Sequence, residues 1–96
     1  MRYTIEGFSQ KELINLKMDL IDAIILRWFI DFKDTGKMSY EIINNDKYYW
    51  VKYEAVLKDL PILNLEKRAL ARRFLKLSEN NVLKHFTKRE KGAFSM

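Results

Sequence analysis

The sequence predicts a single α+β domain with about four helices and two β-hairpins. Three observations support this prediction: apolar residues recur at helical spacing behind capping residues, two β-rich runs flank turn residues, and hydrophobic side chains make up 48% of a 96-residue chain. Chains of this length usually form one domain, and this apolar content is enough to fill its core. We therefore expect one domain over residues 1–96.

Two helices are expected in the first third of the chain. The stretch SQKE at residues 9–12 has the pattern of a capping box, in which the side chains of the serine and the glutamate satisfy backbone N–H groups, and it predicts a short helix over about 10–17. Asp19 is a good N-cap, and Asp22 follows three residues later. Apolar residues then recur at helical spacing, which predicts a long, central helix within 19–36.

A β-hairpin is expected next, over residues 37–53. Its two β-rich runs flank Asn44-Asn45-Asp46, residues that favour tight turns. In DKYYWVKY, residues 46–53, aromatic side chains alternate with lysines. Such a run could stack the bases of a single strand of nucleic acid. Aromatic residues are also good strand formers, so we expect Trp50 to lie in the core.

A short helix, a tight turn and a longer helix are expected after the hairpin. YEAVLKDL predicts the short helix over about 53–60, which stops before Pro61 because the residue before a proline disfavours helical geometry. Asn64 is expected to cap the longer helix, over about 65–79.

The last part of the chain predicts a second hairpin. Asn80-Asn81 is a typical helix end, since asparagine tolerates the left-handed conformation. VLKHFTK at 82–88 indicates a strand, REKG a turn, and AFSM the start of a return strand. The chain stops within that strand, so we expect it to be the N-terminal module of a longer protein.

The expected order is therefore helix, helix, hairpin, helix, helix, hairpin. A short helix, a tight turn, a longer basic helix and a terminal hairpin are typical of a winged helix-turn-helix, in which the second hairpin forms the wing. This is the fold class that the sequence predicts.

Positive charge is concentrated in the last third of the chain. Residues 66–91 hold nine basic and three acidic side chains, a net charge of +6, whereas residues 1–65 hold nine basic and ten acidic ones. A basic surface attracts polyanions, of which nucleic acid is the commonest in a cytoplasm. The nine basic residues are the expected nucleic-acid-binding set: Lys67, Arg68, Arg72, Arg73, Lys76, Lys84, Lys88, Arg89 and Lys91.

The longer helix is expected to divide into an apolar and a basic side. At about 100° per residue, Leu70, Phe74 and Leu77 share one narrow arc. Arg68, Arg72 and Lys76 lie on the opposite side, together with Glu79, while Lys67 and Arg73 lie on the flanks. A helix with basic side chains along one side fits a major groove about 12 Å wide and can bind its phosphates. An ordinary helix whose charges are only solvated has the same pattern. The lysines and arginine of the expected wing favour the first interpretation.

Other classes of site have little support in the sequence. There is no cysteine, and His85 is the only histidine. No metal-ligand cluster, glycine-rich phosphate loop or nucleophile motif is present, so we expect no metal, no cofactor and no enzymatic activity. No apolar stretch is long enough to span a membrane, and the N-terminus lacks a signal core, which together favour a cytoplasmic protein.

Three longer stretches resemble a known family. They are EGFSQKELINLKMDLIDAIILRWFIDFKDTGKM, YYWVKYEAVLKDLPIL and RRFLKLSENNVLK, and the most distinctive pieces are LRWFIDF at 26–32, YWVKY at 49–53 and DLPIL at 59–63. Together they resemble the N-terminal winged-helix domain of phage replisome organiser and replication-initiation proteins of Gram-positive hosts. That family often has glycine where this chain has Asn81, a position that asparagine can also fill.

The resemblance implies a domain that binds origin DNA, with later regions contacting the replication machinery. We accordingly expect double-stranded DNA as the partner, with the basic helix in the major groove and the wing on the backbone. Two alternatives stay open. One is a transcriptional regulator of the same fold, which would usually be a dimer on a palindrome, although a homodimeric initiator is also compatible. The other is a protein-protein interaction module that does not bind DNA.

Overall fold

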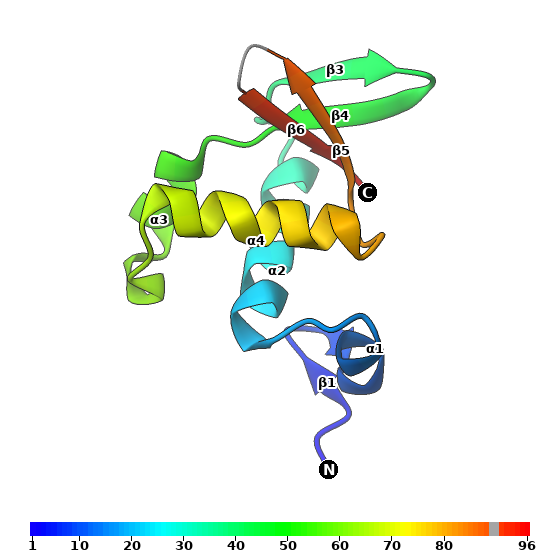
Figure 1. Ribbon diagram of the computed structural model, residues 1–96, viewed down its shortest axis with the longest axis vertical. Helices are drawn as coiled ribbons and strands as arrows, with labels where there is room; N and C mark the ends of the chain where they lie inside the picture. Colours follow the sequence, from blue (N-terminus) through cyan, green and yellow to red (C-terminus); the bar gives the residue numbers. More distant parts are fainter. Residues whose placement is uncertain (89–90) are drawn as a thin grey trace.

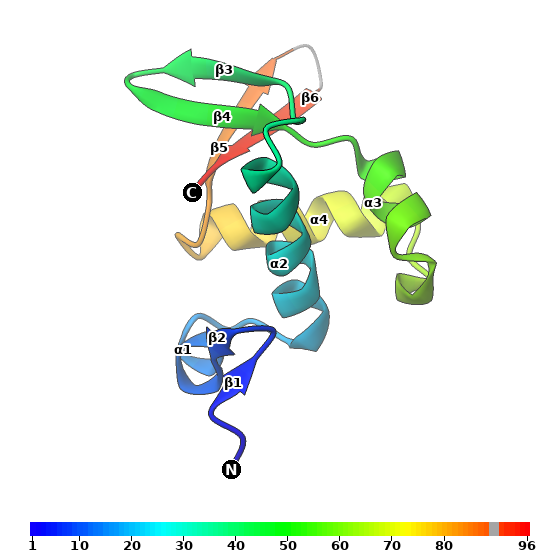
Figure 2. The ribbon, with the colours of Figure 1, turned by 180° about the vertical axis from the view of Figure 1, so that it is seen from behind.

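The computed structural model describes residues 1–88 and 91–96, with the side chain of Lys91 left out. This part of the chain forms a 3₁₀ turn, four α-helices and six strands (Figures 1 and 2). In chain order they are β1 (Thr4–Ile5), β2 (Phe8–Ser9), α1 (Gln10–Asn15), α2 (Leu20–Asp34), β3 (Tyr40–Ile43), β4 (Asp46–Trp50), α3 (Tyr53–Asp59), the 3₁₀ turn η1 (Pro61–Leu63), α4 (Lys67–Glu79), β5 (Lys84–Lys88) and β6 (Lys91–Ser95).

The predicted α+β class is confirmed, with two antiparallel sheets rather than separate hairpins. β1 and β2 form a small ribbon, and the larger sheet has the strand order β3-β4-β6-β5. The second hairpin thus joins the first through the β4–β6 pair, in which Tyr49 lies opposite Phe94. In Figures 1 and 2 this sheet lies at one end of α2, α1 lies at the other end, and α4 crosses α2 between them. This arrangement is compatible with a winged-helix-like fold.

The start of α2 follows the predicted capping pattern in full. The backbone N–H of Asp22 donates to Asp19 Oδ1 at 2.9 Å, and the backbone N–H of Asp19 donates to Asp22 Oδ2 at 3.1 Å. At the start of α1, Ser9 Oγ accepts from the backbone N–H of Glu12 at 3.3 Å. Two N–H groups that a helix start leaves unpaired are therefore satisfied in α2 by its own first-turn carboxylates.

The first hairpin turns at the predicted asparagines. Asn44 and Asn45 both have positive φ, at 51° and 69°, and Ile43 lies opposite Asp46 in the register. Two left-handed residues in a two-residue loop match the right-handed twist of the flanking strands. Glu6 and Gly7 turn the short β1–β2 ribbon in the same way, at 53° and 80°, and this ribbon was not predicted.

The turn between α3 and α4 differs from the prediction in the role of Asn64 and in the residue at which α4 begins. Asn64 does not cap α4: it lies in the left-handed conformation at the end of η1, with φ 50°. α4 begins two residues later than expected, and Glu66 precedes it without a side-chain capping hydrogen bond. Asn81, by contrast, has the predicted left-handed conformation after α4, with φ 62°.

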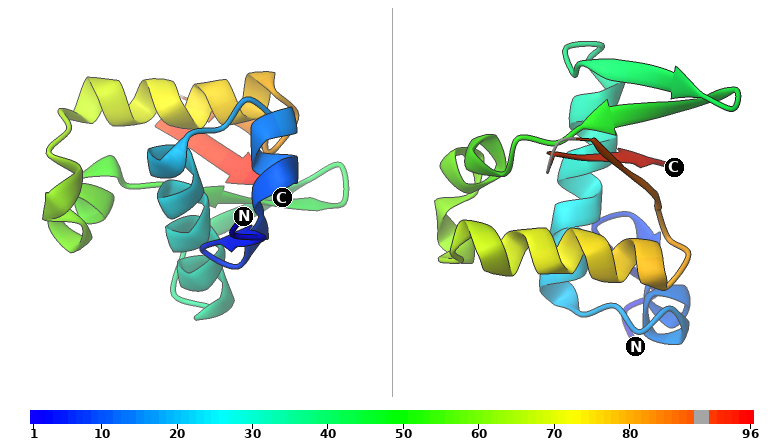
Figure 3. Two further views of the ribbon diagram at one scale, coloured as in Figure 1. Left: turned by 90° about the horizontal axis from the view of Figure 1, so that it is seen from below. Right: turned by 45° about the horizontal axis from the view of Figure 1, so that its top comes forward.

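The core lies where α2, α4 and the larger sheet meet (Figure 3). Phe29 of α2, Phe74 of α4 and Phe94 of β6 are fully buried. The ring of Phe74 lies 6.4 Å from that of Phe29 and 5.1 Å from that of Phe94. Since large-to-small changes of such residues remove about 3–5 kcal/mol of stability, these three rings hold α4 in place.

Candidate nucleic-acid interface

The outer face of α4 carries two exposed arginines. As the helical spacing predicts, Leu70, Phe74 and Leu77 are fully buried, while Arg68 and Arg72 are exposed on the opposite side. Neither arginine forms an ion pair with another residue in the described part of the chain. We call this side, formed by Arg68, Arg72, Leu75 and Glu79, the outer face of α4.

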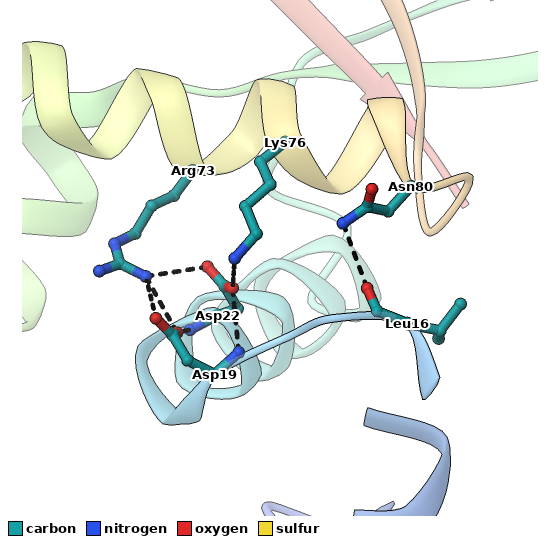
Figure 4. Close-up of polar contacts among 6 residues, drawn as sticks. All are labelled: Leu16, Asp19, Asp22, Arg73, Lys76 and Asn80. Carbon is teal, nitrogen blue, oxygen red and sulfur yellow. Dashed lines mark hydrogen bonds and ion pairs between the residues drawn. The ribbon is translucent and has the colours of Figure 1, made fainter. Parts of the chain in front are cut away.

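Two other basic residues of α4 are held by carboxylates (Figure 4). Lys76 Nζ donates to Asp22 Oδ2 at 2.7 Å. Arg73 Nη1 donates to Asp22 Oδ1 at 3.1 Å and to the two carboxylate oxygens of Asp19 at 2.8 and 2.9 Å. We call these four residues the α4 clamp. The prediction that Lys76 points outward beside Arg72 is therefore wrong, because the start of α2 draws its ammonium group to one flank.

The α4 clamp surrounds a buried carboxylate. Asp22 is 0% exposed, whereas the side chains of Arg73 and Lys76 are 24% and 38% exposed. A buried carboxylate without partners is strongly destabilising, and these two cations and the capping hydrogen bond are the partners that Asp22 has there. The clamp thus ties α4 to the first turn of α2.

Asp19 lies at the exposed edge of the same clamp. Burial alone would raise the pKa of its carboxyl, but the hydrogen bonds from Arg73 and the backbone of Asp22, with the nearby charges of Arg73 and Lys76, hold this pKa below its ordinary value of 3.8. Asp19 in turn raises the pKa of Arg73, chiefly through their hydrogen bond.

Asn80 fixes the end of α4 to the N-terminal segment. Its Nδ2 donates to the backbone carbonyl of Leu16 at 3.1 Å (Figure 4). Asn80 lies one turn after Lys76 on the same flank of the helix. The flank from Arg73 to Asn80 is therefore occupied by contacts with residues 16–22, while the outer face of α4 is exposed among the described residues.

The other predicted basic residues also have carboxylate neighbours where the structure describes them. Lys67 pairs with Glu54 of α3, and Lys84 pairs with Asp46 of β4 at 2.7 Å. Lys88 lies 3.7 Å from Glu41 of β3. These pairs are exposed, and exposed ion pairs are weak and exchange readily with other partners. Arg89 and the side chain of Lys91 lie outside the described residues.

The larger sheet presents aromatic side chains on the side away from α2. Tyr48, Trp50 and Phe86 share this side, with ring centroids 6.2 Å apart for Tyr48–Phe86 and 6.3 Å for Trp50–Phe86. Trp50 is therefore only half-buried, and the expectation that it lies in the core is wrong. The core position next to it in the strand is taken by Tyr49, whose ring meets that of Phe29 edge-on at 6.2 Å.

A cleft of about 620 Å³ opens at the end of the sheet that leads to α3. Trp50 and Gly92 line it from the strands, Tyr53 and Glu54 from the start of α3, and Lys67 from the start of α4. Its other lining residues are Ser39, Glu41, Val51, Lys52 and Lys88. This size falls within the range of pockets that bind small organic groups, and its lining combines two aromatic residues with three lysines and two glutamates.

Within the residues that the structure describes, no group of three or more His, Cys, Asp or Glu side chains is placed to hold a metal ion. His85 stacks on Phe94 with the ring centroids 4.9 Å apart, and partial burial lowers its pKa. The packing against Phe94 is a structural role for His85. None of the described helices combines the length and the apolar character needed to cross a membrane.

Comparisons with protein-family models, with curated proteins and with solved structures find no match for this chain.

Proposed function

We propose that this chain is a winged-helix DNA-binding domain that acts in phage-type replication initiation, with α4 in the major groove. The observation that carries the proposal is the contrast between the two sides of α4. One side is buried against α2 and the sheet, and the outer face presents Arg68 and Arg72 in adjacent turns. Arginines at this spacing can reach phosphates or, with two parallel hydrogen bonds, the edge of a guanine.

The order of the elements supports the proposal. α3, the tight turn η1 and α4 follow one another, and the paired strands β5 and β6 come after α4, an order that is compatible with a winged helix. The net charge of +6 in residues 66–91 adds long-range attraction for a polyanion. Replication initiation, as opposed to another use of DNA binding, rests on the resemblance of LRWFIDF, YWVKY and DLPIL to phage initiators.

The ion pairs of the domain indicate which basic residues can contact DNA directly and which act indirectly. Arg68 and Arg72 contact DNA directly, whereas Lys67 and Lys88 reach phosphates by exchanging their exposed carboxylate partners. Arg73 and Lys76 act indirectly, because the α4 clamp positions the helix that carries the arginines. Four phosphate contacts give a slope of about −4 in a plot of log affinity against log salt.

The test is fluorescence anisotropy of a labelled random-sequence duplex at several salt concentrations. Binding that is tight at low salt and falls with the expected slope supports the proposal. A search for the preferred sequence then follows, because specific contacts to base edges are less sensitive to salt than phosphate contacts. Absence of binding at low salt contradicts the proposal and favours the protein-interaction alternative.

A further inference from the structure

The side of the larger sheet away from α2 has aromatic side chains that duplex binding by α4 does not use. In the described part of the chain, no helix covers this side (Figures 1 and 3). Tyr48, Trp50 and Phe86 lie there, each half-buried. Their contacts with one another are edge-on, at interplanar angles of 62° and 69°, so these contacts are not face-to-face stacks. We call these three residues the aromatic platform.

Lysines border the aromatic platform and the cleft beside it. Lys84 and Lys88 extend from β5 on the same side of the sheet, and Lys52 and Lys67 line the cleft. Their carboxylate partners are Asp46, Glu41 and Glu54, so four lysines face three carboxylates. Each of these ion pairs is largely exposed, which leaves the lysines able to bind a phosphate instead.

The cleft lies between the aromatic platform and the start of α4. Trp50 belongs to the platform and also lines the cleft, and Lys67, at the opposite wall, directly precedes Arg68 in α4. A nucleic acid strand that leaves a duplex bound on α4 can therefore pass Lys67, place a base in the cleft and continue onto the platform. The two carboxylates of the cleft, Glu54 and Glu41, pair with Lys67 and Lys88.

We infer that the aromatic platform and the cleft bind unpaired DNA nucleotides next to the duplex bound by α4. The bases stack on Trp50 and Phe86, and the phosphates bind the neighbouring lysines, as on other sheet surfaces that combine aromatic and basic side chains. This inference rests on the proposed function. The form of DNA that fits the site is a duplex that continues into a single strand.

The test compares a blunt duplex with the same duplex carrying a six-thymidine overhang. We expect the overhang to bind about 10-fold more tightly to the wild-type domain. Trp50→Leu removes stacking and keeps apolar packing on Phe86. It should remove most of this gain, which weakens overhang binding by about 5- to 10-fold, as expected for the loss of one stacked base, and leave blunt-duplex binding within about twofold. Trp50→Phe should retain most of the gain.

Tyr40→Leu is the matched control, because Tyr40 is a half-exposed aromatic residue of β3 that packs on Tyr49, on the other side of the sheet. It should leave the overhang gain unchanged. The urea midpoint of each variant shows whether its fold is intact. As a second readout, the overhang should quench more tryptophan fluorescence in the wild type than in Trp50→Phe.

The outcomes separate the inference from the proposed function. Equal affinity for blunt and overhang DNA, or a gain that survives Trp50→Leu, overturns the inference and leaves duplex binding intact. If the blunt duplex is not bound, the proposed function fails. In that case free oligothymidine decides the inference alone: binding that Trp50→Leu abolishes supports the platform, and no binding rejects it.

Discussion

Two sides of α4 carry basic residues that differ in their ion pairs. On the flank, Arg73 and Lys76 surround Asp22, which is 0% exposed, and join α4 to the start of α2. On the outer face of α4, Arg68 and Arg72 are exposed without an ion pair to any described residue. All four side chains are positively charged, and Arg72 and Arg73 are adjacent in sequence.

The comparison shows that the neighbours of a charge determine its role. A cation beside a buried carboxylate satisfies a group that would otherwise be strongly destabilising, so its contribution is to the fold. A cation in water contributes little to the fold and is available for a polyanion. We therefore expect substitutions on the flank to change stability, and substitutions on the outer face to change DNA affinity.

The largest effect is expected from Asp22→Ala. This change removes the acceptor of Arg73 and Lys76 and half of the capping box, and should lower the free energy of unfolding by about 2–4 kcal/mol. The loss stays below that of a fully buried pair because both cations are partly exposed. Urea denaturation measures it. Glu79→Ala, on the outer face of α4, is the control and should change stability by less than about 0.5 kcal/mol. Equal effects of the two changes contradict the clamp.

The next effect distinguishes two adjacent arginines. Arg72→Ala should weaken duplex binding by about 1–3 kcal/mol, because it removes a proposed direct contact, and leave the urea midpoint unchanged. Arg73→Ala should do the reverse, lowering the urea midpoint and leaving the affinity of the folded domain within about twofold. Anisotropy and urea denaturation on both variants check the pair. A result in which both residues affect only binding would remove the distinction between flank and outer face.

A smaller effect on stability is expected when the pH is lowered. Because the folded pKa of Asp19 is lowered, its charge stabilises the fold above the unfolded value of 3.8, and this stability is lost as pH falls through the folded pKa. Asp19→Asn lacks this titration. Between pH 6 and pH 3, the free energy of unfolding of the variant, measured by urea denaturation, should therefore fall less than that of the wild type, by a difference below about 1 kcal/mol, since Asp19 is half exposed. Equal losses of stability in the wild type and in Asp19→Asn would contradict the coupling of the Asp19 charge to the fold.

The smallest effect is expected from the hairpin of β5 and β6. Lys88→Ala removes one proposed phosphate contact, so it should weaken binding to all duplex sequences alike and reduce the salt slope by about 1. Lys11→Ala is the control, because Lys11 lies in α1, at the end of the molecule away from the sheet (Figure 1). If the effect of Lys88→Ala depends on sequence, the hairpin reads bases rather than phosphates.

Most of the fold followed from local signals in the sequence. Asp19 and Asp22, Asn44-Asn45 and Asn81 each act where they lie in the chain, so their patterns predicted a helix start, a turn and a helix end. The β1–β2 ribbon was missed because its strands have two residues each, too few to show alternation. Asn64 was misassigned because asparagine suits both a helix cap and the left-handed turn that it forms here.

The candidate site was predictable only in part. The apolar arc of Leu70, Phe74 and Leu77 correctly gave the side of α4 that is buried. The α4 clamp was not predictable, because its ion pairs join residues 51 and 54 positions apart, and a helical wheel contains no information on such partners. Trp50 was placed in the core since a strand pattern with imperfect alternation does not show which of two adjacent aromatic residues faces α2.

Binding of a random-sequence duplex by the double variant Arg68→Ala/Arg72→Ala, measured against salt beside the wild type, tests the central claim most directly. We predict an unchanged urea midpoint, a large loss of affinity at low salt and a salt slope that is smaller by about 2, one for each lost contact. Wild-type affinity and slope in the double variant would contradict the account, because they would show that the outer face of α4 does not bind DNA.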